Sequence, residues 1–182
     1  MDFLVSNCNR DFANRNGMEQ NPLFVMGTLF GIVNGTCRFF WGYLLDKYGF
    51  KLLMTIITFI EITVGTCLYF MVKIYPVYII LVLFAASCIG GNFCILTPVF
   101  NQIFGLEMGP EVYAVTSIAI GTANICGPLI VNLFLKENSD FLYAFLLGAT
   151  LSVIKLCVLV FFDDDDKFVP STKLLPEEKN EK

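Results

Sequence analysis

Asn34 and Arg38 are the residues best suited to chemistry, because they place an amide and a guanidinium inside an apolar run of the chain. The two lie four residues apart, so a helix would carry them on one face. A charge at such depth is costly, and it is expected to snorkel to the interface, to form an ion pair or to line a polar cavity. We favour the cavity for Arg38, with Asn34 beside it.

A turn rich in charge and glycine follows this run and ends it. Gly42 permits close contact with a second helix near the membrane surface, and Asp46 stands at the predicted helix end. Gly49 is suited to supply the positive φ of a tight reversal. Lys47 and Lys51 flank that glycine and are expected to stay in the water phase.

Composition indicates that the elements positioning these residues lie in a membrane. Of 182 residues, 56% are hydrophobic and 15% are charged, and the mean hydropathy is +0.69. Five runs have roughly the 20 residues that a helix needs to cross a hydrocarbon core. These spans cover residues 23–45, 52–72, 76–99, 113–135 and 141–162, between a polar N-terminal segment at 1–22 and an acidic tail at 163–182.

The spans predict an all-α, multi-pass bundle. Only helices and closed barrels satisfy every backbone polar group in lipid, and the runs lack the alternation of barrel strands. Residues 1–22 contain no apolar region of signal-peptide length, and residues 1–5 are a candidate for the end of an earlier helix. Five spans place the termini on opposite sides of the membrane, and a weak bias of Lys and Arg predicts that the tail at 163–182 is cytoplasmic. The acidic composition of that tail predicts that it is disordered.

Residue counts argue against several classes of function. The sequence contains no His, which removes His-based triads and zinc motifs. The 7 Cys include no C-x-x-C pair and lie mostly in the spans, where a thiol is usually a small apolar residue. A net charge of -4 disfavours nucleic acid as a partner. We therefore expect no enzyme, no cofactor and no metal.

Other residues of the spans bear on function. Glu61 lies near the middle of the second span, where a structural pairing and ion coupling are equally good interpretations. Asn124 belongs to a stripe of small and polar residues that indicates either a helix interface or a cavity wall. Lys155 is expected to snorkel toward the polar tail. Three glycines at intervals of four predict close packing of the first span on another helix: Gly27, Gly31 and Gly35.

The spacing of the charged turn resembles the signature loop of the major facilitator superfamily, G-x-x-x-D-[RK]-x-G-[RK]-[RK]. Phe50 replaces one basic residue of that pattern. In the family this loop joins the second and third helices of each six-helix half on the cytoplasmic side. The resemblance implies that the spans are helices eight to twelve. It also implies a cytoplasmic gate formed by Gly42, Asp46, Lys47, Gly49 and Lys51.

The same resemblance extends to the polar connector between the third and fourth spans. Phe104 and Gly105, followed by Tyr113, are similar to the region that enters the eleventh helix of these transporters. We expect a connector over about 100–111 and a helix that starts near Pro110. Family structure would place that helix start beside Asp46.

Residues 34–49 are more narrowly similar to the eighth helix of monocarboxylate transporters and of the oxalate/formate antiporter-like branch. There the corresponding arginine faces the central cavity and pairs with a carboxylate substrate, which implies that role for Arg38, while Asn34 and Asn124 are expected to line the cavity. Monocarboxylate transporters often carry an aspartate where this chain has Asn34. The antiporters carry a lysine on the helix that corresponds to 113–135, where this sequence has none.

The leading hypothesis is secondary-active transport of a small organic anion, monocarboxylate-like, by alternating access. Such transporters hold substrate between two halves. We therefore expect the chain to work in a lipid bilayer as part of a longer or paired transporter, with a missing N-terminal half or a second copy as partner. The alternative is a non-transporting membrane subunit, or a truncated relic, that packs with a partner membrane protein through its glycines.

Overall fold

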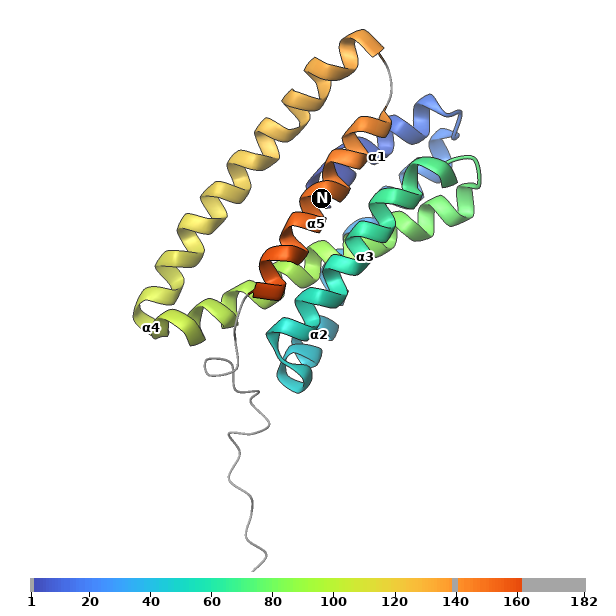
Figure 1. Ribbon diagram of the computed structural model, residues 1–182. Coiled ribbons are helices and arrows are strands. Elements are labelled where there is room, and N and C mark those ends of the chain that lie inside the picture. The colour runs from blue at the N-terminus through green and yellow to red at the C-terminus, as the bar shows by residue number, and fades with distance from the viewer. Residues whose placement is uncertain (1, 139–140, 162–182) are drawn as a thin grey trace, which may run out of the picture.

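The computed structural model describes residues 2–138 and 141–161. Five helical elements follow one another and run back and forth along the molecule (Figure 1). They are α1 (Asp2–Arg15), α2 (Gln20–Tyr48), α3 (Phe50–Met71), α4 (Tyr75–Asn138) and α5 (Phe141–Phe161). The predicted all-α, multi-pass bundle is confirmed. The predicted tail at 163–182 lies outside the described residues.

Four elements, α2 to α5, are long and apolar enough to cross a membrane. Of these, α4 contains two predicted spans, because its backbone leaves the helical region at Gly105, with φ 81° and ψ 168°. The predicted spans 76–99 and 113–135 lie on either side of this residue. The expected connector at 100–111 is wrong in extent, since helix continues up to Gly105 and resumes directly after it, ahead of Pro110.

Single glycines reverse the chain at two points. Gly49, between α2 and α3, has φ 84° and ψ 170°, almost the same backbone conformation as Gly105. L side chains seldom adopt a positive φ, so glycine replaces a longer loop at both points. The positive φ predicted for Gly49 is therefore confirmed. Both reversals lie toward the same end of the bundle (Figure 1).

The helices enclose two apolar clusters, one toward each end of the bundle. The cluster nearer the reversals joins α2, α3 and α4 through residues such as Trp41, Ile57 and Ile95. The other joins α1, α3, α4 and α5 through Phe12, Tyr78 and Phe145, among others. Together they hold α2 against the first half of α4 and hold α3 against α4 and α5.

The polar segment 1–22 contains a helix that packs on the bundle. Phe12 of α1 is only 4% exposed. Its ring packs against four others: Tyr69, Tyr78, Phe141 and Phe145. The Tyr78 hydroxyl also donates a hydrogen bond to the Asn9 carbonyl at 2.7 Å. The sequence offered only residues 1–5 as the end of a helix, because the buried face of α1 is narrow and its other residues are polar.

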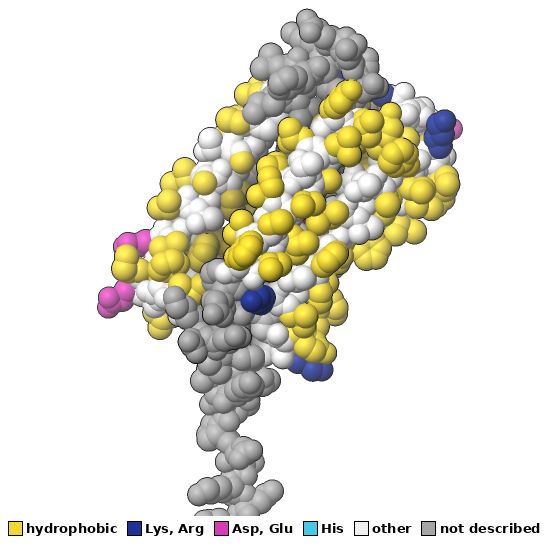
Figure 2. All heavy atoms as spheres, viewed as in Figure 1, with side chains coloured by type: hydrophobic (Ala, Val, Ile, Leu, Met, Phe, Trp, Pro, Cys, Tyr) yellow, Lys and Arg dark blue, Asp and Glu magenta, His cyan; other side chains and the backbone are white. Residues whose placement is uncertain are grey.

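The surface suits lipid rather than water. Figure 2 shows hydrophobic side chains over much of one face. Phe39 is 85% exposed and Phe161 is 89% exposed. Contiguous apolar surface of this kind is unusual on a soluble monomer. It is what the hydrocarbon region of a bilayer requires of a spanning helix.

Candidate functional site

Gly42, on α2 ahead of the charged turn, lies in close contact with α4. A Cβ added there would lie 3.3 Å from the Cys94 Sγ, so a larger residue would press on α4. This is the close helix contact predicted for Gly42. Asp46 and Lys47 are exposed, as their position at the end of α2 requires.

The reversal that follows is closed by the backbone. The Gly49 N–H donates to the Leu45 carbonyl at 3.0 Å and caps the last turn of α2. Lys47 Nζ lies 5.2 Å from the centre of the Tyr48 ring. Lys51 is half-buried in the first turn of α3. Four residues of the predicted gate therefore lie at one short turn, and the fifth, Gly42, lies ahead of it on α2.

Two glycines of α4 make the closest approach to α2. A Cβ on Gly90 would lie 2.5 Å from the Asn34 carbonyl oxygen, and one on Gly91 would lie 3.0 Å from the Trp41 ring. The Trp41 indole N–H then donates to the Ser87 hydroxyl at 3.0 Å. The two helices therefore pack almost backbone to backbone along this line.

Asn34 lies in this contact with an unusual hydrogen-bond state. Its Oδ1 is buried and lacks a hydrogen-bond partner among residues 2–138 and 141–161. A buried acceptor without a donor costs about 1–3 kcal/mol. An amide in that position is a weak point of the packing, and such groups call for an explanation beyond packing.

The predicted packing of Gly27, Gly31 and Gly35 is wrong within the described chain. All three are exposed, and a Cβ added to any of them would meet nothing within 4 Å. Spacing by four fixes that glycines share a face but does not fix which face meets a neighbour. Gly90 and Gly91 of α4 supply the close contact instead, against the adjacent face of α2 that carries Asn34 and Trp41.

Arg38 is exposed on α2 and faces an aromatic ring. Its guanidinium carbon lies 5.8 Å from the centre of the Phe93 ring of α4. Its carbonyl accepts a hydrogen bond from the Cys94 thiol at 3.2 Å. The described ranges contain no carboxylate in an ion pair with this guanidinium. The structural ion pair considered for Arg38 is therefore not formed there.

Glu61 lies inside the bundle and is held by three side chains from two other helices. Its Oε1 accepts from Lys155 Nζ at 3.0 Å and from Asn92 Nδ2 at 2.8 Å. Its Oε2 accepts from the Ser152 hydroxyl at 3.4 Å. Lys155 Nζ also donates to Asn92 Oδ1 at 3.2 Å. The carboxylate is only 3% exposed, whereas the Lys155 side chain is 31% exposed.

The expectation that Lys155 snorkels is therefore wrong. Its ammonium points into the bundle, because Glu61 on α3 offers a carboxylate at a depth where a lone charge is costly. No spacing rule could find this group, since Lys155 lies 94 positions after Glu61 and Asn92 lies 31 after it. The sequence offered one indication of this group, namely that Glu61, Asn92 and Lys155 are polar residues inside three separate spans.

Asn124 lies on the helix that follows Gly105 and is half-buried. In the part of the chain that the structure describes, it forms no hydrogen bond with Asn34 or Arg38. Apolar neighbours on its helix are exposed, with Val115 at 68% and Ile118 at 71%. Within the described residues, Asn124 is therefore not joined by a hydrogen bond to the other two residues predicted to bind substrate, which lie one turn apart on α2.

Four long apolar helices and a buried ion pair define an integral, multi-pass membrane protein. The family model described as the Major Facilitator Superfamily matches residues 17–180. The chain therefore belongs to the Major Facilitator Superfamily, whose members are membrane transporters and not enzymes. No curated protein and no solved structure gives a significant match to the chain.

Proposed function

We propose that this chain carries out secondary-active transport of a small organic anion, monocarboxylate-like, by alternating access. It does so as part of a longer or paired transporter, with a missing N-terminal half or a second copy of the chain as the other wall of the site. Membership of a transporter family supports the general activity. The substrate class depends on Arg38 and on its resemblance to the monocarboxylate and oxalate/formate branch.

The observation that carries the substrate class is the distribution of charge within the spans. Glu61 and Lys155 neutralise each other at 3.0 Å. Arg38 lacks an ion-paired carboxylate within the described ranges, so among those residues its positive charge is available to a ligand. A guanidinium presents a planar fork of N–H donors that matches a carboxylate. An anion entering from the exposed side of α2 would satisfy it.

Asn34 and Asn124 complete the proposed substrate-binding set. Asn34 lies one turn before Arg38. Its amide N–H2 group is the part suited to donate to a carboxylate, since the buried Oδ1 can only accept. Asn124 is half-buried on the helix after Gly105. Closure of the two halves would bring polar groups of these helices to one substrate. Without substrate and without the other half, we expect these residues to lie apart from one another.

The turn around Gly49 is the proposed cytoplasmic gate. Asp46, Lys47, Gly49 and Lys51 lie at one short turn that joins two spans without a loop, and Gly42 lies ahead of it on α2. A turn this short transmits movement of α2 directly to α3, which suits rocking of one half against the other. Glu61, held by Lys155, is better suited to fastening these helices than to ion coupling.

Uptake measurements with the native full-length product test the binding role. Arg38→Ala is expected to lower uptake efficiency for lactate, pyruvate and acetate about 10- to 100-fold, the value of a lost charge-assisted hydrogen bond. Arg38→Lys retains the charge and should lose less. Arg10→Ala, which removes an exposed cation of α1, is the matched control. If Arg38→Ala left uptake unchanged while Asp46→Asn abolished it, the proposed binding role of Arg38 would be wrong and only the proposed gate would stand.

The exposed glycines of α2 favour one alternative function, that of a non-transporting subunit. Gly27, Gly31 and Gly35 form an open face that a partner helix can approach closely. This alternative predicts that bulky substitutions on that face abolish assembly while Arg38→Ala changes nothing. Uptake by the assembled protein separates the two functions, since only transport requires Arg38.

A further inference from the structure

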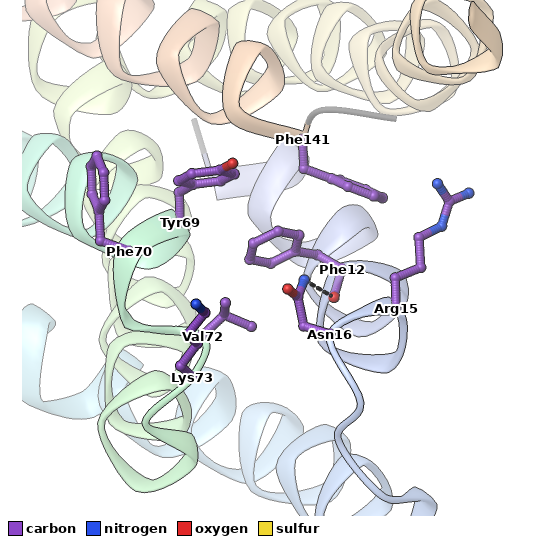
Figure 3. Close-up of a pocket in the computed structure, with 8 residues that line it drawn as sticks. All are labelled: Phe12, Arg15, Asn16, Tyr69, Phe70, Val72, Lys73 and Phe141. Atoms are coloured by element: carbon purple, nitrogen blue, oxygen red, sulfur yellow. Dashed lines mark hydrogen bonds between the residues drawn. The ribbon is translucent and has the colours of Figure 1, made fainter. Parts of the chain in front are cut away.

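A cavity of ≈ 530 Å³ lies at the end of the bundle away from the two glycine reversals. It opens between the end of α1, the end of α3 and the beginning of α5 (Figure 3). Eight residues line it: Phe12, Arg15, Asn16, Tyr69, Phe70, Val72, Lys73 and Phe141. None of these eight residues takes part in the proposed substrate site or in the gate.

The lining carries two positive charges and no negative charge. Arg15 and Lys73 are both exposed, and Figure 3 places them on opposite sides of the cavity. The guanidinium carbon of Arg15 lies 5.2 Å from the centre of the Phe141 ring. Asp11, one turn earlier on α1, forms no ion pair with Arg15 in the described chain. Two cations without a described carboxylate partner favour an anionic ligand.

The remaining walls are aromatic and lie beside lipid-facing surface. The rings of Phe12, Tyr69 and Phe141 form one side of the cavity (Figure 3). Phe70, also in the lining, is 66% exposed, and Ile74 nearby is 53% exposed. Rings beside cations at the ends of spanning helices match a molecule with a charged head and an apolar body. A small hydrophilic anion would gain nothing from contact with this apolar wall.

We propose that this cavity binds the headgroup of an anionic membrane phospholipid. The lipid phosphate lies between Arg15 and Lys73, and the first part of its apolar body lies along Phe70, the exposed ring of the lining. The end of α3 and the beginning of α5 meet here, and lipid headgroups are found at the level of such helix ends. The bound lipid thereby joins α1 to the two spans on which it packs.

Native mass spectrometry of the detergent-purified full chain tests the site. The protein is equilibrated with phosphatidylglycerol, with zwitterionic phosphatidylcholine or with inorganic phosphate, and retained molecules are counted. We expect retention of phosphatidylglycerol in preference to phosphatidylcholine. The double variant Arg15→Gln with Lys73→Gln should bind it about 25-fold more weakly, since each cation contributes roughly fivefold.

Matched variants separate a built site from general charge. Arg10→Gln with Lys47→Gln removes the same charge from exposed residues outside the cavity and should leave retention unchanged. Arg15→Lys with Lys73→Arg keeps the charge and should also bind, which covers the case that the Gln variants fold poorly. Equal losses in both Gln pairs, equal retention of the two lipids, or displacement by millimolar phosphate would each overturn the proposal.

Discussion

The Glu61 carboxylate accepts hydrogen bonds from three side chains, and these partners explain why it tolerates membrane depth. Lys155, Asn92 and Ser152 donate to it from α5 and α4. Removing one partner of a buried ion pair leaves an uncompensated charge, which typically costs about 3–5 kcal/mol. The contribution of this pair is therefore best measured by removing each side and then exchanging the two.

We predict that Lys155→Met and Glu61→Gln each lower the free energy of unfolding by about 3 kcal/mol. The exchange Glu61→Lys with Lys155→Glu should recover part of that loss, because the pair is re-formed in reverse. Unfolding in SDS titrations, followed by circular dichroism, gives the three values. Lys47→Met, at an exposed position, is the control. Losses that simply add in the exchanged variant would show that the two charges do not interact.

At the scale of elements, the contact between α2 and α4 depends on which helix provides the small residues. Gly90 and Gly91 of α4 leave no room for a Cβ against Asn34, Trp41 and Ile57. The glycines of α2 lie on its open side and meet nothing within 4 Å. A methyl group is therefore expected to have opposite effects on the two helices.

Gly90→Ala should separate α2 from α4 and lower the free energy of unfolding by about 1–3 kcal/mol, as overpacking does elsewhere. Gly31→Ala should leave it unchanged or raise it by up to about 1 kcal/mol, because Ala favours an exposed helix more than Gly. Both variants can be measured in the same SDS titration. Equal destabilisation by the two substitutions would contradict the packing described for α2.

At the scale of the whole molecule, the open face of α2 is where the missing half or a second copy is proposed to pack. The face combines Gly27, Gly31 and Gly35 with exposed apolar neighbours such as Phe24 and Ile32. Small residues let two helix backbones approach closely in lipid, where no hydrophobic force draws helices together. A side chain that is harmless in the separate chain is therefore expected to block assembly.

We predict that Gly31→Leu abolishes assembly and uptake while the unfolding of the separate chain stays within about 1 kcal/mol of the wild type. Assembly is measured by crosslinking in native membranes. The control is Ile125→Leu, a conservative substitution at an exposed position of the helix after Gly105. Normal assembly of Gly31→Leu would place the partner on another face of the molecule.

Residue types and run lengths by themselves determined that this chain is an all-α membrane bundle and that Gly49 takes a positive φ. Those features follow from local rules, because a bilayer fixes helix length and only glycine readily makes such a reversal. The same rules did not predict that Gly105 alone would reverse the chain in place of the expected connector at 100–111.

Only the tertiary structure decided which side chains meet. It paired Glu61 with Lys155, turned Gly31 and its neighbours outward, and buried Phe12 of a segment that reads as polar. Each outcome depends on how separate helices rotate and pack. Rotation is set by contacts between residues tens of positions apart, such as the 94 that separate Glu61 and Lys155. No periodicity within one span contains that information.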